Sequence, residues 1–91
     1  MEFLTLEGIE PAMRALDYGA EKYEHYNYYK GHSVNQLVAA CMRHVLQFKD
    51  GEDLDPESGI SHLGHAMACL LMLSKQIAMG VEVDDRYRGE S

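Results

Sequence analysis

The chain has 91 residues, enough for one small domain and too few for a multidomain enzyme. Apolar residues make up 46% of it, which is typical of a globular protein and too high for a disordered one. There are 15 acidic and 8 basic residues, so the formal charge is −7. Binding to a nucleic-acid polymer depends on Lys and Arg contacts with phosphates, so we expect no such partner.

Neither export nor membrane insertion is predicted. The start, residues 1–3, has no basic region followed by an apolar run, and the longest apolar stretch, residues 66–73, is too short to cross a bilayer. The cysteines Cys41 and Cys69 have neither metal-ligand spacing nor a disulfide framework around them. We therefore expect a cytoplasmic protein with no membrane partner.

The first expected helix runs from about Glu10 to Tyr23. Pro11 suits the first turn, where its missing N–H costs nothing. Spacings of three and four predict one apolar stripe made of Ile9, Met13, Leu16, Ala20 and Tyr23. An aromatic loop follows to Gly31, and its tyrosines either pack or stack on a nucleotide base.

The second expected helix begins at Ser33, where Gln36 completes a capping box, and ends at Gly51. Its predicted apolar face consists of Leu37, Cys41, Val45 and Phe48. An acidic connection, residues 51–59, leads into a third helix. That helix is expected to start either at Asp55, with Pro56 as its first residue, or just after Gly59.

The third helix is expected to end near Met79, with Gly80 following it. Residues 63–77 are apolar on almost every side, and such a helix needs burial all round. We therefore predict an all-α domain over residues 1–80, a three-helix bundle completed by homo-oligomerisation, and a charged tail over residues 81–91. In that tail Val81 and Val83 favour a short strand.

Polar residues interrupt the apolar faces of the second and third expected helices at corresponding positions along the two helices. Ser58, His62 and His65 share one face of the third helix, and Arg43 and His44 interrupt the second. If the two helices are antiparallel, these residues face each other across a groove with the acidic loop at its mouth. The histidines are then either satisfied core residues or ligand contacts, with His62 and His65 as the candidates for catalysis.

Two kinds of metal site are compatible with these residues. His62 and His65 can hold a transition metal if His44, Asp55 or Glu57 supplies a third ligand. Alternatively, carboxylate oxygens of the acidic loop can hold Mg²⁺ together with a nucleotide phosphate. The carboxylates in question belong to Glu52, Asp53, Asp55 and Glu57. The spacing equally fits an acidic loop in which Asp55 only caps a helix.

Several runs resemble one known family. Residues 18–23, Tyr-Gly-Ala-Glu-Lys-Tyr, and residues 27–31, with Asn27, Tyr28 and Lys30-Gly31, are similar to motifs of the dATP/dGTP diphosphohydrolase N-terminal domains, which are common in phages. Arg43-His44 resembles that family's Arg-His pair. The longest motif spans residues 51–59 and continues into His62-Leu63 and His65-Ala66. The resemblance covers residues 11–73.

The resemblance implies an all-α nucleotide-recognising fold, distantly similar to MazG-type pyrophosphohydrolases. Those enzymes cleave NTPs with Mg²⁺ held by acidic residues on two helices, and they form dimers or tetramers. Here residues 33–49 contain no acidic residue, the third helix has none after Glu57, and Cys69 stands where the family leads us to expect Asn. The helical carboxylates that would hold the metal are therefore missing.

Two functions follow. The first is a small phage-type protein of the host cytosol that binds or sequesters a purine nucleotide, or a nucleotide-derived signal, in a groove between subunits. The second is a Mg²⁺-dependent purine dNTP pyrophosphohydrolase that releases dNMP and pyrophosphate. The residues assigned to nucleotide binding are Lys22, Tyr28, Tyr29, Lys30, Arg43, His44, Ser58, His62 and His65.

Overall fold

Three helices dominate the described residues, which are 5–23, 32–81 and 83–87 of a computed structural model. They are α1 (Leu6–Tyr23), α2 (Val34–Lys49) and α3 (His62–Met79). Beyond them, the described part of the chain has only two isolated β-bridges. The prediction of an all-α three-helix fold is confirmed. No helix in these ranges is long and apolar enough to cross a membrane.

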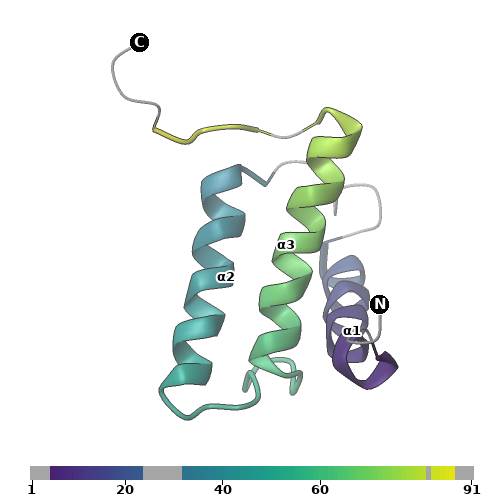
Figure 1. The fold of residues 1–91 in the computed structure, drawn as a ribbon, viewed down its shortest axis with the longest axis vertical. Helices are drawn as coiled ribbons and strands as arrows, with labels where there is room; N and C mark the ends of the chain where they lie inside the picture. Colours follow the sequence, from purple (N-terminus) through teal and green to yellow (C-terminus); the bar gives the residue numbers. More distant parts are fainter. Residues whose placement is uncertain (1–4, 24–31, 82, 88–91) are drawn as a thin grey trace.

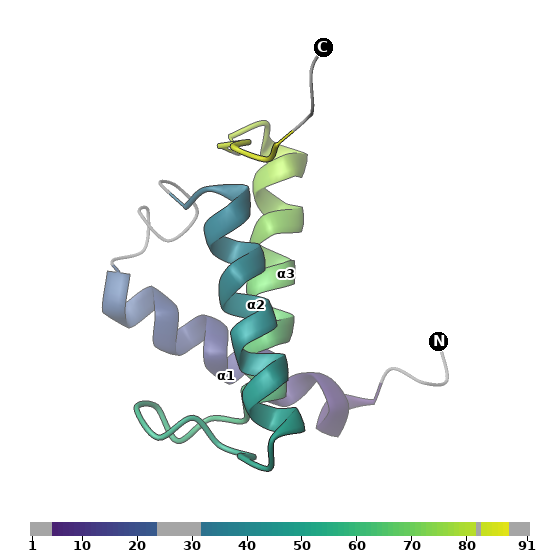
Figure 2. The same cartoon turned by 90° about the vertical axis from the view of Figure 1, so that its left-hand side faces the viewer.

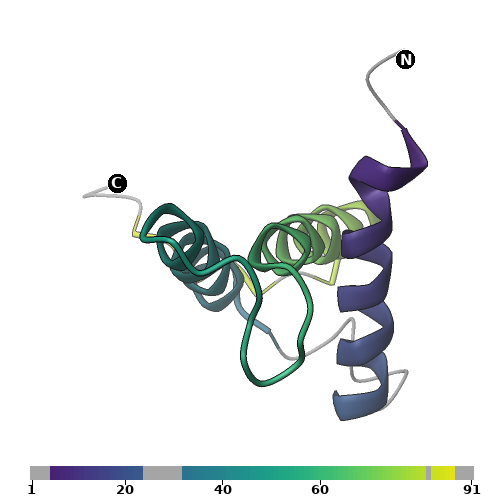
Figure 3. The ribbon, with the colours of Figure 1, turned by 90° about the horizontal axis from the view of Figure 1, so that it is seen from below.

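The helix α3 lies between the other two and packs against both, whereas α1 and α2 do not contact each other (Figure 1). The helices α2 and α3 run side by side in opposite directions, as the predicted groove requires. Figures 2 and 3 show that α1 crosses this pair at a steep angle. The helices α1 and α2 thus pack on α3 from different sides without packing against each other.

The prediction for the start of α1 is wrong by four residues. The helix begins at Leu6, and the carbonyl of Thr5 accepts hydrogen bonds from the N–H groups of Gly8 and Ile9. Pro11 therefore lies inside the helix, not in its first turn. The predicted apolar stripe is also only partly buried, because Ile9 and Met13 are exposed.

The face of α1 that contacts α3 carries small side chains. Ala12, Ala15 and Gly19 are buried there. On α3, Gly64 faces α1 so closely that an added Cβ would lie 2.6 Å from the carbonyl oxygen of Pro11. Small residues let the two helix backbones approach, so size rather than hydrophobicity selects the buried face.

The predicted capping box of α2 is confirmed. The Ser33 side chain accepts a hydrogen bond from the Gln36 N–H, and the Gln36 side chain accepts one from the Ser33 N–H. The tail joins this helix start: Val34 donates to the carbonyl of Val83, and the Asn35 N–H donates to the Asp85 carboxylate. The predicted strand at the tail is thus a single bridge between Ser33 and Val83.

Of the two predicted starts for α3, the one after Gly59 is nearly right, and the start at Asp55 is wrong. Ser61 caps the helix, and its hydroxyl accepts a hydrogen bond from Leu63 N–H. The Asp55 carboxylate caps a separate turn by accepting hydrogen bonds from Ser58. Gly59 then has a φ of 73°, which no helix tolerates. The predicted end is confirmed, since Gly80 follows Met79 in the left-handed conformation.

Large apolar side chains remain exposed on α2 and α3, as well as on α1. Apolar residues exposed on α3 include Leu63, Leu70, Leu71 and Ile77, and those on α2 include Val38, Met42, Val45 and Leu46. The predicted α2 face is therefore only partly covered, with Leu37 buried and Val45 and Phe48 exposed. This exposure is what an oligomerising chain would show, and the oligomer stays a prediction.

Candidate functional site

A pocket of about 330 Å³ opens between the three helices and the loop that joins α2 to α3. Small residues line it on every helix: Ala15 and Gly19 on α1, Ala40 on α2 and Ala68 on α3. Because these side chains are short, the steeply crossed helices leave space there instead of filling it. Gly19, which interrupts the first helix in the sequence, thus borders the cavity.

Polar and ionisable side chains gather along the same pocket. They are Tyr18, His32, Gln36, Arg43, His44, Asp55, Glu57 and His65. Among the described residues, no carboxylate forms an ion pair with Arg43. Its charge is therefore available to an anionic ligand.

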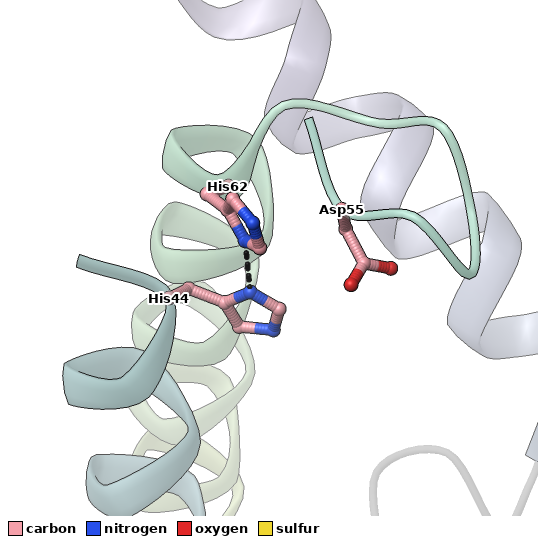
Figure 4. A group of neighbouring side chains, drawn as sticks. All are labelled: His44, Asp55 and His62. Atoms are coloured by element: carbon pink, nitrogen blue, oxygen red, sulfur yellow. Dashed lines mark hydrogen bonds between the residues drawn. The ribbon is translucent and has the colours of Figure 1, made fainter. Parts of the chain in front are cut away.

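Two histidines meet where α2 and α3 lie closest to the loop. His44 Nδ1 and His62 Nδ1 are 2.8 Å apart (Figure 4). The other ring nitrogen of His62, Nε2, is 2.7 Å from Oε1 of Glu52. An ionised Glu52 can only accept, so a neutral His62 carries its proton on Nε2 and presents the Nδ1 lone pair to His44. His44 then donates from Nδ1, which completes a chain from Glu52 through His62 to His44.

The third histidine, His65, belongs to a second chain. Its Nε2 lies 2.7 Å from the hydroxyl of Ser58, which also donates to Oδ2 of Asp55 at 2.9 Å. The His65 ring stacks on His44 with centroids 4.7 Å apart and an angle of 13° between the rings. The two polar chains are thus joined through stacked imidazoles, as the predicted facing stripes require.

Burial keeps these imidazoles neutral. It lowers the pKa of His44 to about 4, and the neighbouring His65 and Arg43 act in the same direction. The pKa of His65 is also lowered, mainly by burial, although Asp55 opposes the change. At neutral pH both rings therefore offer a lone pair rather than a positive charge.

The carboxyl of Asp55 stays ionised. Burial acts to raise its pKa, but the hydrogen bonds from the Ser58 hydroxyl and backbone N–H outweigh burial, so the pKa lies below 3.8. Cys69, on the pocket wall, behaves in the opposite way, since burial raises the pKa of its thiol to about 11. A thiolate nucleophile is therefore not available from Cys69 at neutral pH.

The comparisons with known proteins agree with the motifs. A family model described as dATP/dGTP diphosphohydrolase, N-terminal, matches residues 1–86. The chain belongs to this family. A dATP/dGTP diphosphohydrolase of Salmonella phage PMBT28 is 32% identical over 77 residues, which cover 85% of this chain and 26% of that protein. The chain thus spans about a quarter of that relative's length. No solved structure matches the chain.

The predicted binding residues of the chain fall into three groups. Arg43, His44 and His65 line the pocket, and Ser58 holds His65. His62 is fully buried behind His44 and does not line the pocket. Outside the described residues lie Tyr28, Tyr29 and Lys30, together with the side chain of Lys22.

The acidic loop of the domain does not form the predicted oxygen cage. The Glu52 carboxylate contacts His62, Asp55 accepts from Ser58, and the Glu57 carboxylate accepts from Tyr18 at 3.1 Å. Asp53 contributes its backbone carbonyl, which accepts from the His62 N–H. Among the described residues, the potential ligands that converge are His44, Asp55 and His62, with one carboxylate between them. Magnesium held by all four acids therefore stays a prediction without geometric support.

Tyr18 and Gln36 also line the pocket, although neither was among the predicted binding residues and Gln36 was predicted only as part of the capping box. Tyr18 stands in the first family motif, so that motif was the available signal. The pairing of His44 with His62 had no local signal, because the two residues are 18 positions apart on different helices.

Proposed function

We propose that this domain binds a purine deoxynucleotide in the pocket between α1, α2 and α3. The pocket carries the proposal: its volume of about 330 Å³ lies within the range of small-ligand sites. One side is apolar and formed by short side chains, so it suits a flat base or a sugar. The purine preference comes from the name of the family and of its phage relative.

The phosphate end of the ligand is assigned to Arg43. Its guanidinium has no described carboxylate partner, and guanidinium groups bind phosphate oxygens in a bidentate manner. The neutral rings of His44 and His65 supply hydrogen-bonding groups next to it. The net charge of −7 does not oppose this assignment, because Arg43 lines the pocket itself.

Calorimetric titration with dATP, dGTP and dCTP tests the binding. A charge-assisted hydrogen bond contributes about 1.5–3 kcal/mol, so Arg43→Gln should weaken binding by about 10-fold to 150-fold. The matched control is Arg14→Gln, since Arg14 is exposed on α1, pairs with Glu10 and does not line the pocket. Equal affinity of the wild type and Arg43→Gln contradicts the assignment, and no binding of any nucleotide contradicts the function.

Hydrolysis of dATP and dGTP is the second candidate function, and the name of the phage relative favours it. In this function His44, neutral at the pocket wall, accepts the proton of the attacking water, since general bases need a lone pair at working pH. Sequestration of an intact nucleotide differs from it only in the fate of the ligand.

Recovery of the ligand separates the two functions. The protein is incubated with dATP or dGTP and Mg²⁺ or Mn²⁺, denatured, and its small molecules are identified by mass spectrometry. Deoxynucleoside monophosphate and pyrophosphate, lost in His44→Gln, support hydrolysis. Intact triphosphate after prolonged incubation at high protein concentration supports binding alone.

Assembly with a second copy of the chain is part of the proposal. The exposed apolar residues of α2 and α3 form the surface that would be covered. Native mass spectrometry of the purified chain tests this, and a monomer at micromolar concentration contradicts it.

A further inference from the structure

Two imidazole nitrogens and a carboxylate lie close together at the N-terminal end of α3. The Nδ1 atoms of His44 and His62 are 2.8 Å apart, and one ligand atom from each of His44, His62 and Asp55 lies within 4.8 Å of the others (Figure 4). The three residues come from α2, α3 and the loop between them. We propose that these three side chains bind a divalent transition-metal ion.

Glu52 orients one ligand of this site. Its carboxylate accepts from Nε2 of His62 at 2.7 Å, which leaves the Nδ1 lone pair of His62 directed inward. Histidines that bind metals almost always donate their second ring N–H to a carboxylate, carbonyl or water in this way. The His62 side chain is fully buried, so its ring is held in place on all sides.

The loop orients the carboxylate ligand. The backbone N–H and the hydroxyl of Ser58 both bond to Oδ2 of Asp55, at 3.0 and 2.9 Å. No described donor contacts Oδ1, which is therefore available to a cation. A ligating carboxylate that is itself hydrogen-bonded is the usual arrangement at metal sites.

Coordination of one ion requires the two histidine nitrogens to separate and the Asp55 carboxylate, whose ligand atom lies within 4.8 Å of theirs, to approach them. With metal–nitrogen bonds of 2.0–2.1 Å, tetrahedral coordination places two ligand nitrogens about 3.3 Å apart. The observed 2.8 Å separation must therefore widen by about 0.5 Å, which a small rotation of the His44 ring provides. His44 must also carry its ring proton on Nε2 instead of Nδ1, so that both Nδ1 lone pairs face the ion. In this metal-bound form His44 cannot be the general base of the hydrolase alternative.

The donor set selects the class of ion. Two imidazoles and one carboxylate suit zinc, iron or cobalt, whereas Mg²⁺ prefers oxygen ligands alone. Asp55 as ligand and Glu52 behind His62 bring two negative charges, which balance a dication. His44 and Asp55 also line the pocket, so the remaining coordination positions face the space in which a ligand would lie. The site does not depend on nucleotide binding.

Metal titration of the whole chain tests the site. After dialysis against a chelator, Zn²⁺ is added in the calorimeter and Co²⁺ is followed by visible absorption. We expect one ion per chain, with Co²⁺ bands that indicate nitrogen ligands, and no displacement by an equal concentration of Mg²⁺. No ion bound in stoichiometric amount, or displacement by Mg²⁺, overturns the proposal.

Variants locate the ion. His44→Gln and Asp55→Asn should abolish stoichiometric binding of the ion. Glu52→Gln should raise the Kd for Zn²⁺ by about 10-fold to 100-fold, because it weakens the hydrogen-bond partner of the ligand His62. His32→Gln is the matched control, because it removes a histidine outside the three-residue group. Unchanged Zn²⁺ affinity in His44→Gln or Asp55→Asn overturns the assignment.

Nitrogen NMR of the wild-type imidazoles provides a test that needs no variant. On addition of Zn²⁺, the Nδ1 resonances of His44 and His62 should shift, while the Nε2 proton of His62 stays bonded to Glu52. A shift confined to other histidines, or to the Nε2 atoms, overturns the assignment. Nucleotide binding measured with the chelator present is independent of each of these results.

Discussion

The close contact between α1 and α3 predicts that Gly64→Ala destabilises the fold. A Cβ on Gly64 would lie 2.6 Å from the carbonyl oxygen of Pro11, 2.7 Å from its carbonyl carbon and 2.8 Å from its Cβ. Ordinary contacts between such atoms are about 3.5–4.0 Å, so the two helices must separate by about 1 Å. Most of the opposing atoms belong to the backbone, which cannot rotate away as a flexible side chain does.

The expected magnitude is a balance of two effects. Overpacking of a buried contact costs about 1–3 kcal/mol, and replacing a helical glycine by alanine returns at most about 1 kcal/mol. The mid-range overpacking cost less the full return leaves a net loss of about 1 kcal/mol of unfolding free energy, and the upper limit is about 3 kcal/mol. For a domain of this size, each kcal/mol lost lowers Tm by about 4–8 °C.

Gly8→Ala is the matched control, because Gly8 is an exposed glycine of the same fold. Its added Cβ would meet only the Thr5 hydroxyl at 3.5 Å, an ordinary contact, so the substitution should stabilise α1 by up to about 1 kcal/mol. Urea unfolding followed by circular dichroism measures both variants. If Gly64→Ala is as stable as Gly8→Ala, the inferred backbone contact is wrong.

Acidification and the loss of Ser58 should each destabilise the histidine cluster. Because the folded-state pKa of His44 is about 4 and its ordinary value is 6.5, the unfolded chain binds protons more strongly between these values. The contribution of His44 to the free energy of unfolding should therefore be constant above pH 6.5. It should fall as the pH drops towards 4, by on the order of 3 kcal/mol. An equally steep fall in His44→Gln would assign the loss of stability to another group. Ser58→Ala removes the hydroxyl that bonds Asp55 and His65, and should cost about 1–3 kcal/mol of unfolding free energy at neutral pH. The pKa of Asp55 should rise in that variant, and an unchanged carboxyl titration by NMR would show that the hydroxyl does not lower it.

Local signals predicted the three helices and some of their ends, but not always the buried faces. The capping box at Ser33 and the left-handed glycine at 80 are set by neighbouring residues, so the sequence was sufficient to locate them. The start at Leu6 was missed because Pro11 also fits a first turn. The apolar stripe of α1 was misplaced because the steep crossing over α3 favours small side chains over large apolar ones.

The candidate site, too, was predicted from the sequence only in part. Its residue types, a pair of stripes with Arg43, His44 and His65, were visible in the sequence because helical periodicity fixes which residues share a face. The partners within those stripes were not visible. Asp55, expected to cap a helix, to hold magnesium with its neighbours or to be a third ligand beside His62 and His65, caps a turn and stands beside His44 and His62.

By itself, the sequence determined that the chain is all-α, where the capping box of α2 and the glycine after α3 lie, and which family it belongs to. These properties depend on residues close together in the chain or on their order along it. Only the tertiary structure decided that His44 meets His62 instead of His65 at its Nδ1 atom, and that a pocket remains beside them. The physical reason is that such contacts depend on the crossing angle and separation of helices. Here a buried glycine against Pro11 and a tight loop set that angle and separation.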